Sequence, residues 1–112
     1  MINAVHAADE SGVVVARLWQ EFRSEPWPAR LNGAELAGID LVTLDADLAG
    51  CVDTWLNNGG LLDARRLRIV NRRLRELEQV LPQLTEADAP RRWRRLHQLA
   101  QHISDDTLYP TN

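Results

Sequence analysis

Two closely spaced aspartates, Asp45 and Asp47, follow the apolar run LVTL of residues 41–44. If a strand delivers such a pair to the edge of a sheet, the carboxylates can act as nucleophile and general acid/base, or bind a divalent cation. If a helix carries them, they can form ion pairs with nearby arginines. The first arrangement belongs to an enzyme, and the second is typical of a structural or binding protein.

The segment resembles the first motif of haloacid-dehalogenase-type phosphatases, which use such a pair as nucleophile and acid/base. The resemblance covers residues 41–47 only. The Gly-Thr pair that follows in those enzymes is replaced here by Leu48 and Ala49. The chain also lacks the alternating strand and helix pattern that a parallel sheet requires. We therefore predict no catalytic residue, no cofactor and no enzymatic activity.

A helix accounts better for the apolar residues around the pair. With Leu41 at zero and about 100° per residue, one arc about 120° wide contains Leu44, Leu48, Val52, Trp55 and Leu56. Asp45 falls inside this arc and is predicted to be partly buried, so it needs a partner. We expect an ion pair with Arg73 or Arg66 that fastens the second helix to the third. In the alternative, this helix is rotated and Asp45 reaches water.

Periodic apolar residues elsewhere in the chain predict an all-α fold. The expected helices span about residues 10–23, 40–57, 63–81 and 86–104. Asp63 can cap the third helix, and Thr85 with Asp88 forms a capping-box pattern before the fourth. No run alternates as a half-buried strand does. We predict a single domain over residues 1–112, a small antiparallel bundle with the first helix closing one side.

Charge is distributed unevenly along the chain, although the net charge is only −3. Residues 1–63 hold three arginines and ten acidic residues, whereas residues 64–112 hold ten arginines and six acidic residues. Residues 31–63 contain no basic residue, and the chain has no lysine. This separation predicts either that the two parts neutralise each other in the fold, or that one face is offered to a partner of opposite charge.

Composition argues against several classes of site. Cys51 is the only cysteine, so no intrachain disulfide forms, and the N-terminal segment lacks the pattern of a signal peptide. No apolar run is long enough to span a membrane, and we expect a cytoplasmic protein. His97 and His102 are five residues apart, which separates them by about 140° on a helix, so we predict no metal site.

Two aromatic residues have competing interpretations. The basic run RRWRR at residues 91–95 resembles a nucleic-acid patch, but its Trp93 belongs to an apolar helical stripe and the net charge is negative. We therefore predict no nucleic-acid partner. Trp27 lies between Pro26 and Pro28, where it either closes one end of the core or anchors a partner.

The run LDADLAGCV in an all-helical chain resembles small uncharacterised bacterial helical proteins. At the level of a class, the chain also resembles immunity proteins and antitoxins, which bind and neutralise a toxin. That resemblance implies an acidic face that occludes a basic toxin or enzyme. The expected contact residues are Glu35, Asp40, Asp47 and Asp53, with Trp27 as an anchor. The alternative is a self-associating helical scaffold, in which the Leu67–Leu81 row extends between copies, or a regulatory interaction protein.

Overall fold

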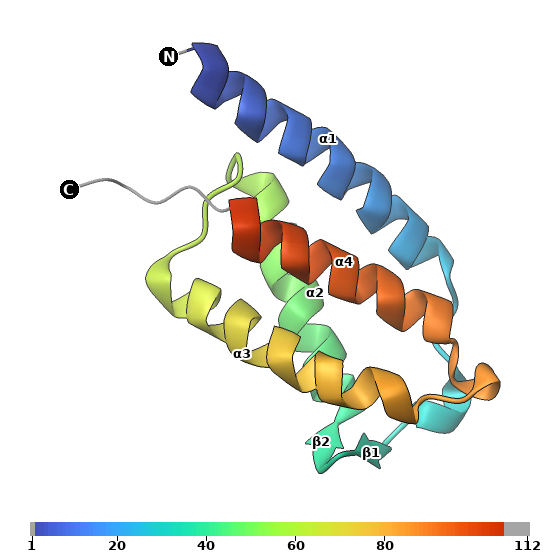
Figure 1. The fold of residues 1–112 in the computed structure, drawn as a ribbon. Coiled ribbons are helices and arrows are strands. Elements are labelled where there is room, and N and C mark those ends of the chain that lie inside the picture. The colour runs from blue at the N-terminus through green and yellow to red at the C-terminus, as the bar shows by residue number, and fades with distance from the viewer. Residues whose placement is uncertain (1, 107–112) are drawn as a thin grey trace.

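The computed structural model describes residues 2–106, which form four α-helices (Figure 1). The helices are α1 (Ile2–Ser24), α2 (Leu41–Asn57), α3 (Ala64–Val80) and α4 (Pro90–Asp106). Single 3-10 turns lie at Ala29–Leu31, Leu81–Gln83 and Glu86–Asp88. Two short strands, β1 (Glu35–Leu36) and β2 (Ile39–Asp40), precede α2. The predicted all-α fold is confirmed.

Two helix boundaries differ from the prediction. The first helix begins at Ile2 instead of residue 10, because no proline or glycine interrupts the chain before Gly12. The fourth begins at Pro90 instead of residue 86. Thr85 and Asp88 do form the capping box, but it closes a 3-10 turn, and Ala89 at φ 56° then ends that turn. Proline suits the first position of a helix because it has no N–H to leave unsatisfied.

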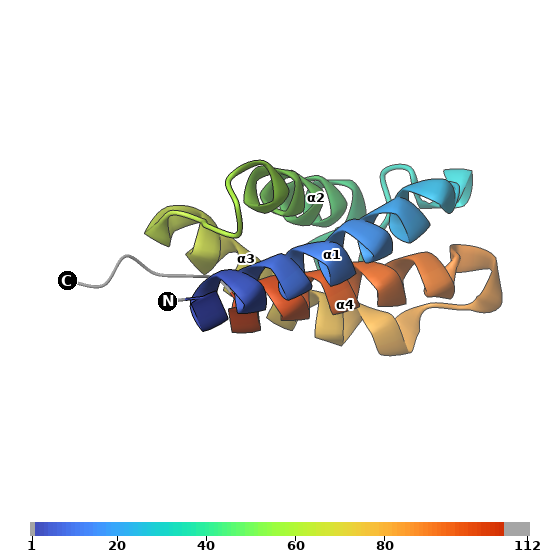
Figure 2. The same cartoon turned by 90° about the horizontal axis from the view of Figure 1, so that it is seen from above.

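The helices form a bundle in which α3 and α4 are antiparallel neighbours (Figure 1). Two side-chain contacts fix their register, Glu78 with His97 near one end and Asn71 with Ser104 near the other. Seen from above, α1 runs alongside α4, and α2 lies above them in this view (Figure 2). Helix α2 packs against both α3 and α4. The first helix thus closes one side of the bundle, as the sequence predicted.

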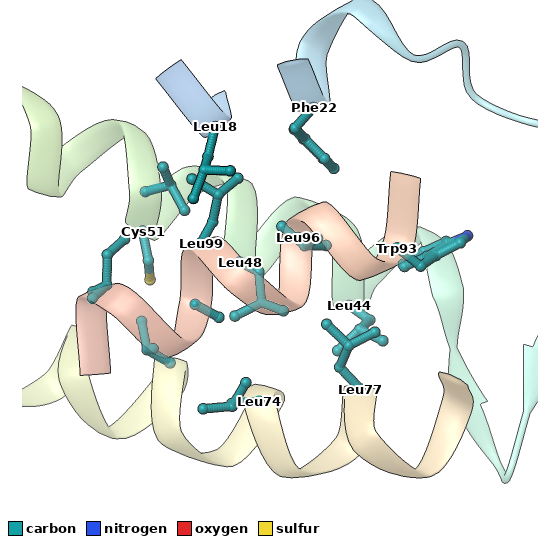
Figure 3. Packing of buried hydrophobic residues seen from close by; sticks show 14 of the residues in the cluster. Leu18, Phe22, Leu44, Leu48, Cys51, Leu74, Leu77, Trp93, Leu96 and Leu99 are labelled. Atoms are coloured by element: carbon teal, nitrogen blue, oxygen red, sulfur yellow. The ribbon is translucent and has the colours of Figure 1, made fainter. Parts of the chain in front are cut away.

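The core is built by leucines from all four helices (Figure 3). Leu18 of α1 points toward α4, while Leu74 and Leu77 of α3 point toward the same interior from the opposite side. The predicted apolar row of α3 is buried at Leu67, Val70, Leu74, Leu77 and Val80. Nowhere in residues 2–106 is a helix both long and apolar enough to cross a membrane.

The strand pair is a feature that the sequence pattern did not predict. Its register places Glu35 opposite Asp40, and the loop between the strands consists of Ala37 and Gly38. Both loop residues have positive φ, 54° and 74°, as tight hairpins require. Glycine adopts this conformation without strain, whereas Ala37 does so at a cost of about 1 kcal/mol or more. Strands of two residues are too short to produce a readable alternation.

Candidate functional site

Asp45 forms an ion pair with Arg92 of α4, with 2.8 Å between Oδ1 and Nη1. The prediction that Asp45 is partly buried is confirmed, since its side chain is 19% exposed. The predicted partners Arg66 and Arg73 are wrong. Arg66 instead pairs with Asp63 of its own first turn. Helix α4 packs against α2 as well as α3, so it can supply the arginine, and the pair fastens α2 to α4.

The Arg92 guanidinium lies among three aromatic rings. Its central carbon is 4.3 Å from the ring centroid of Phe22, 4.9 Å from that of Trp27 and 5.5 Å from that of Trp93. A desolvated guanidinium over aromatic faces gains cation–π stabilisation. Its Nε and Nη1 have no hydrogen-bond partner in the part of the chain that the structure describes, so the ion pair with Asp45 and the rings carry its stabilisation.

Trp27 lies in the loop that follows α1 and packs against this cluster. Its ring packs edge to face against that of Trp93, with 5.7 Å between the ring centroids. Its Nε1–H donates a hydrogen bond of 2.6 Å to Oδ1 of Asn32. The half-buried ring therefore covers the Arg92 guanidinium. These contacts favour the interpretation of Trp27 as a structural residue over that of a partner anchor.

Asp47 lies on the other side of α2 and is engaged by Arg73 of α3. Arg73 donates from Nε to Asp47 at 2.9 Å and from Nη1 to Glu76 at 2.8 Å. Burial alone would lower the pKa of Arg73, but the bonds to the two carboxylates raise it. Asp47, which we expected to be a free contact residue, is therefore part of a structural network. A link between α2 and α3 does exist, but Asp47 makes it, two residues beyond the predicted Asp45.

The remaining predicted contact residues, Glu35, Asp40 and Asp53, are exposed and have no ion pair among the described residues. Asp40 caps α2 by accepting a hydrogen bond of 2.9 Å from the Thr43 backbone N–H. This bond lowers the pKa of Asp40. Asp40 therefore stays ionised beside Glu35, its neighbour across the hairpin. We call Glu35 and Asp40 the acidic surface. Asp53 lies about 20 Å further along α2 and is not part of it.

The basic run of α4 is largely neutralised within the chain. Arg95 pairs with Glu21 of α1 at 3.1 Å, and Arg91 lies 3.9 Å from Glu25. Trp93 is fully buried, as the prediction of a core residue requires. Three of the four arginines of RRWRR therefore face Glu21, Glu25 and Asp45, and the run is not presented as a free basic patch.

The histidines of α4 have separate partners. His97 contacts Glu78 at 2.9 Å, and His102 lies 3.5 Å from Asp106, which also accepts a hydrogen bond from Ser11. Within residues 2–106, no three histidine, cysteine, aspartate or glutamate side chains group in a way that could hold a metal ion. Cys51 is buried, and burial raises the pKa of its thiol, which makes it a poor nucleophile.

Sequence reasoning missed a row of arginines on the outer face of α3. Arg65, Arg68, Arg72 and Arg75 are all exposed. The spacing of three, four and three residues was visible in the sequence and marks one face of a helix. We call these four residues the arginine stripe.

Comparison with known proteins supplies no relative for this chain. It matches no family model, and neither the curated proteins nor the solved structures contain a match.

Proposed function

We propose that the chain is a non-enzymatic protein-binding module of the immunity or antitoxin type, which binds a basic partner through its acidic surface. The observation that carries the proposal is the cross-strand register of Glu35 and Asp40. Two like charges directly opposite each other in a hairpin are destabilising. A basic side chain from a partner would relieve this repulsion.

The surroundings of the pair support a basic partner. Residues 31–63 contain no arginine or lysine, so the hairpin and α2 have no cation of their own to offer these carboxylates. Val42 is 44% exposed next to the hairpin and provides an apolar contact within the acidic surface. Interfaces commonly combine an apolar centre with charged residues that accelerate association. Asp47 and Trp27 are left out of the proposed interface because contacts within the chain occupy them.

The proposed mechanism is steric occlusion of a toxin or enzyme, with charge complementarity setting the rate of association. A cytoplasmic location is part of the proposal, and the single buried thiol of Cys51 suits a reducing compartment.

Capture of a partner from the native host by immobilised protein tests the proposal. Glu35→Arg together with Asp40→Asn removes the paired charges. Asparagine still caps a helix, and the new arginine would face a neutral residue across the hairpin, so the fold is preserved. We expect one stoichiometric partner with the wild type and its loss with this variant. Glu86→Arg, at an exposed acid on the turn before α4, is the matched control and should retain the partner.

Identification of the captured protein by mass spectrometry at low and moderate salt completes the test. A basic partner that dissociates as salt rises agrees with the proposal, because screening weakens exposed charge pairs. Equal capture by the wild type and the Glu35→Arg, Asp40→Asn variant would contradict it.

The scaffold alternative finds less support. It relied on the Leu67–Leu81 row, yet Leu67, Leu74 and Leu77 pack inside the chain. A second copy would need to unfold the bundle to reach them.

A further inference from the structure

The arginine stripe is the strongest charge concentration that the fold leaves unneutralised. In the described part of the chain, none of its four guanidinium groups lies in an ion pair. On a helical wheel the four residues fall within about 80°, opposite the buried row of α3. They extend about 15 Å along the helix. A hollow of about 660 Å³ lies among them, lined also by Ile69 and Asn71.

The acids of α3 do not compensate the stripe. Glu76 lies one turn after Arg72, but its carboxylate is bound by Arg73, and Glu78 contacts His97. Neither acid forms an ion pair with the stripe among the described residues. Arginines three or four residues apart on a helix repel one another, which makes the stripe a cost to the isolated fold. An exposed surface whose like charges repel one another suits an anionic partner.

We propose that the arginine stripe docks an acidic helix of a partner protein. A helix that carries glutamates at positions i, i+3, i+7 and i+10 has the same rise between charges as the stripe, so four pairs can form at once. Arginine presents a planar fork that binds carboxylates in a bidentate manner. Ile69 gives the hollow one apolar wall, in the manner of a helix-in-groove contact flanked by charge pairs.

The same charges could bind the phosphates of a nucleic acid, but other observations favour a protein helix. The whole chain carries −3, so a long polyanion that extends beyond the stripe would be repelled by the rest of the surface. The stripe and the side chains that line its hollow include no aromatic ring on which a base could stack. A helix of about ten residues would contact only the stripe. This inference is independent of the acidic surface, which lies on other elements.

Fluorescence anisotropy with synthetic peptides tests the proposal. The probe is a labelled helical peptide with glutamates at i, i+3, i+7 and i+10, compared with a peptide of the same composition in scrambled order. We expect the patterned peptide to bind the full chain about tenfold more tightly at low salt, with binding lost as salt rises. Arg68→Gln with Arg72→Gln should weaken this binding about tenfold or more.

Arg94→Gln is the matched control, because Arg94 is an exposed arginine of α4 without an ion pair in the described residues. It should leave the affinity unchanged. The melting temperature of each variant reports folding directly. Equal binding of the scrambled peptide, equal weakening by Arg94→Gln, or no binding at low salt would overturn the proposal.

Two further measurements exclude the other occupants. Tighter binding of duplex DNA or RNA than of the patterned peptide would assign the stripe to phosphates and overturn the protein-helix proposal. A concentration-dependent mass that Arg68→Gln with Arg72→Gln abolishes would assign it to the acidic segment of a second copy, with the same consequence. A strict monomer that prefers the peptide supports the proposal.

Discussion

The arginine-rich helices α3 and α4 differ in how many of their arginines contact acids of other helices. In α4, Arg92 and Arg95 face acids of α2 and α1 and help to hold three helices together. In α3, Arg66 and Arg73 are the arginines that form ion pairs within residues 2–106, and the arginine stripe faces outward. The difference follows from position, because α4 packs against both α1 and α2 whereas the outer face of α3 meets no other helix (Figure 1). Composition alone does not separate a structural arginine from one that is free to bind.

The largest effect should come from breaking the most buried pair. Asp45→Asn leaves Arg92 charged among aromatic rings with its side chain only 8% exposed. Loss of one partner from such a pair should lower the free energy of unfolding by about 3 kcal/mol. Urea denaturation measures this loss. An unchanged midpoint would show that the rings stabilise the guanidinium without the carboxylate.

A compensating variant sharpens the same test. Replacing both partners, with Asp45→Leu and Arg92→Met, removes the charges together and keeps apolar volume in the site. Buried pairs replaced in this way are often neutral in stability. We expect the double variant to unfold closer to the wild-type midpoint than Asp45→Asn does.

The pair between α2 and α3 should matter less. The Arg73 side chain is 14% exposed, but its partners Asp47 and Glu76 are 36% and 28% exposed. Arg73→Gln should therefore cost about 1 kcal/mol, because partly solvated carboxylates recover water when the arginine is lost. A loss equal to that of Asp45→Asn in the same denaturation assay would contradict the difference we draw between the two pairs.

Acid should weaken the N-terminal caps of α2 and α3, whereas the arginines keep their charge at low pH. Asp40 and Asp63 accept backbone N–H bonds that lower their pKa values in the folded chain. Their stabilisation is complete above the unfolded value of about 3.9 and is lost as the pH falls through the lower folded values. Melting temperatures measured from pH 7 to pH 2 should fall below about pH 4. Asp40→Asn with Asp63→Asn should flatten that decline, and an unaltered decline would assign it to other carboxylates.

The smallest effect on stability is expected at the arginine stripe. Arg68→Gln with Arg72→Gln removes repulsive pairs from the surface of α3 and should raise the free energy of unfolding by about 0.5 kcal/mol. Thermal melting at low salt is the suitable measurement, because salt screens the repulsion. A destabilisation of 1 kcal/mol or more would mean that these side chains have partners within the folded chain.

Local patterns predicted much of the fold. The apolar row of α3 and the cap at Asp63 are properties of neighbouring residues, and both appear in the structure. The burial of Asp45 also followed from its place on one helical wheel. The hairpin was missed because each strand has two residues, and its turn uses Ala37 where glycine or asparagine is the usual signal.

The partner of Asp45 could not be predicted in the same way. A wheel shows which side of α2 carries the carboxylate, but the choice between Arg73 and Arg92 depends on which helix packs there. That choice is a long-range property of the bundle. The predicted set of contact acids was too large for the same reason, because the ion pair between Asp47 and Arg73 depends on how α2 and α3 are packed.

Because the chain has no lysine, digestion with trypsin can report on the helices that carry the arginines. Trypsin cleaves after arginine or lysine, so every tryptic site of this chain is an arginine. Cleavage within α3 requires the helix to open, since a protease needs an extended backbone as well as a reachable side chain. The fragments from brief digestion therefore report how often α3 opens relative to α4, and an acidic helix bound along the stripe would delay the α3 fragments selectively.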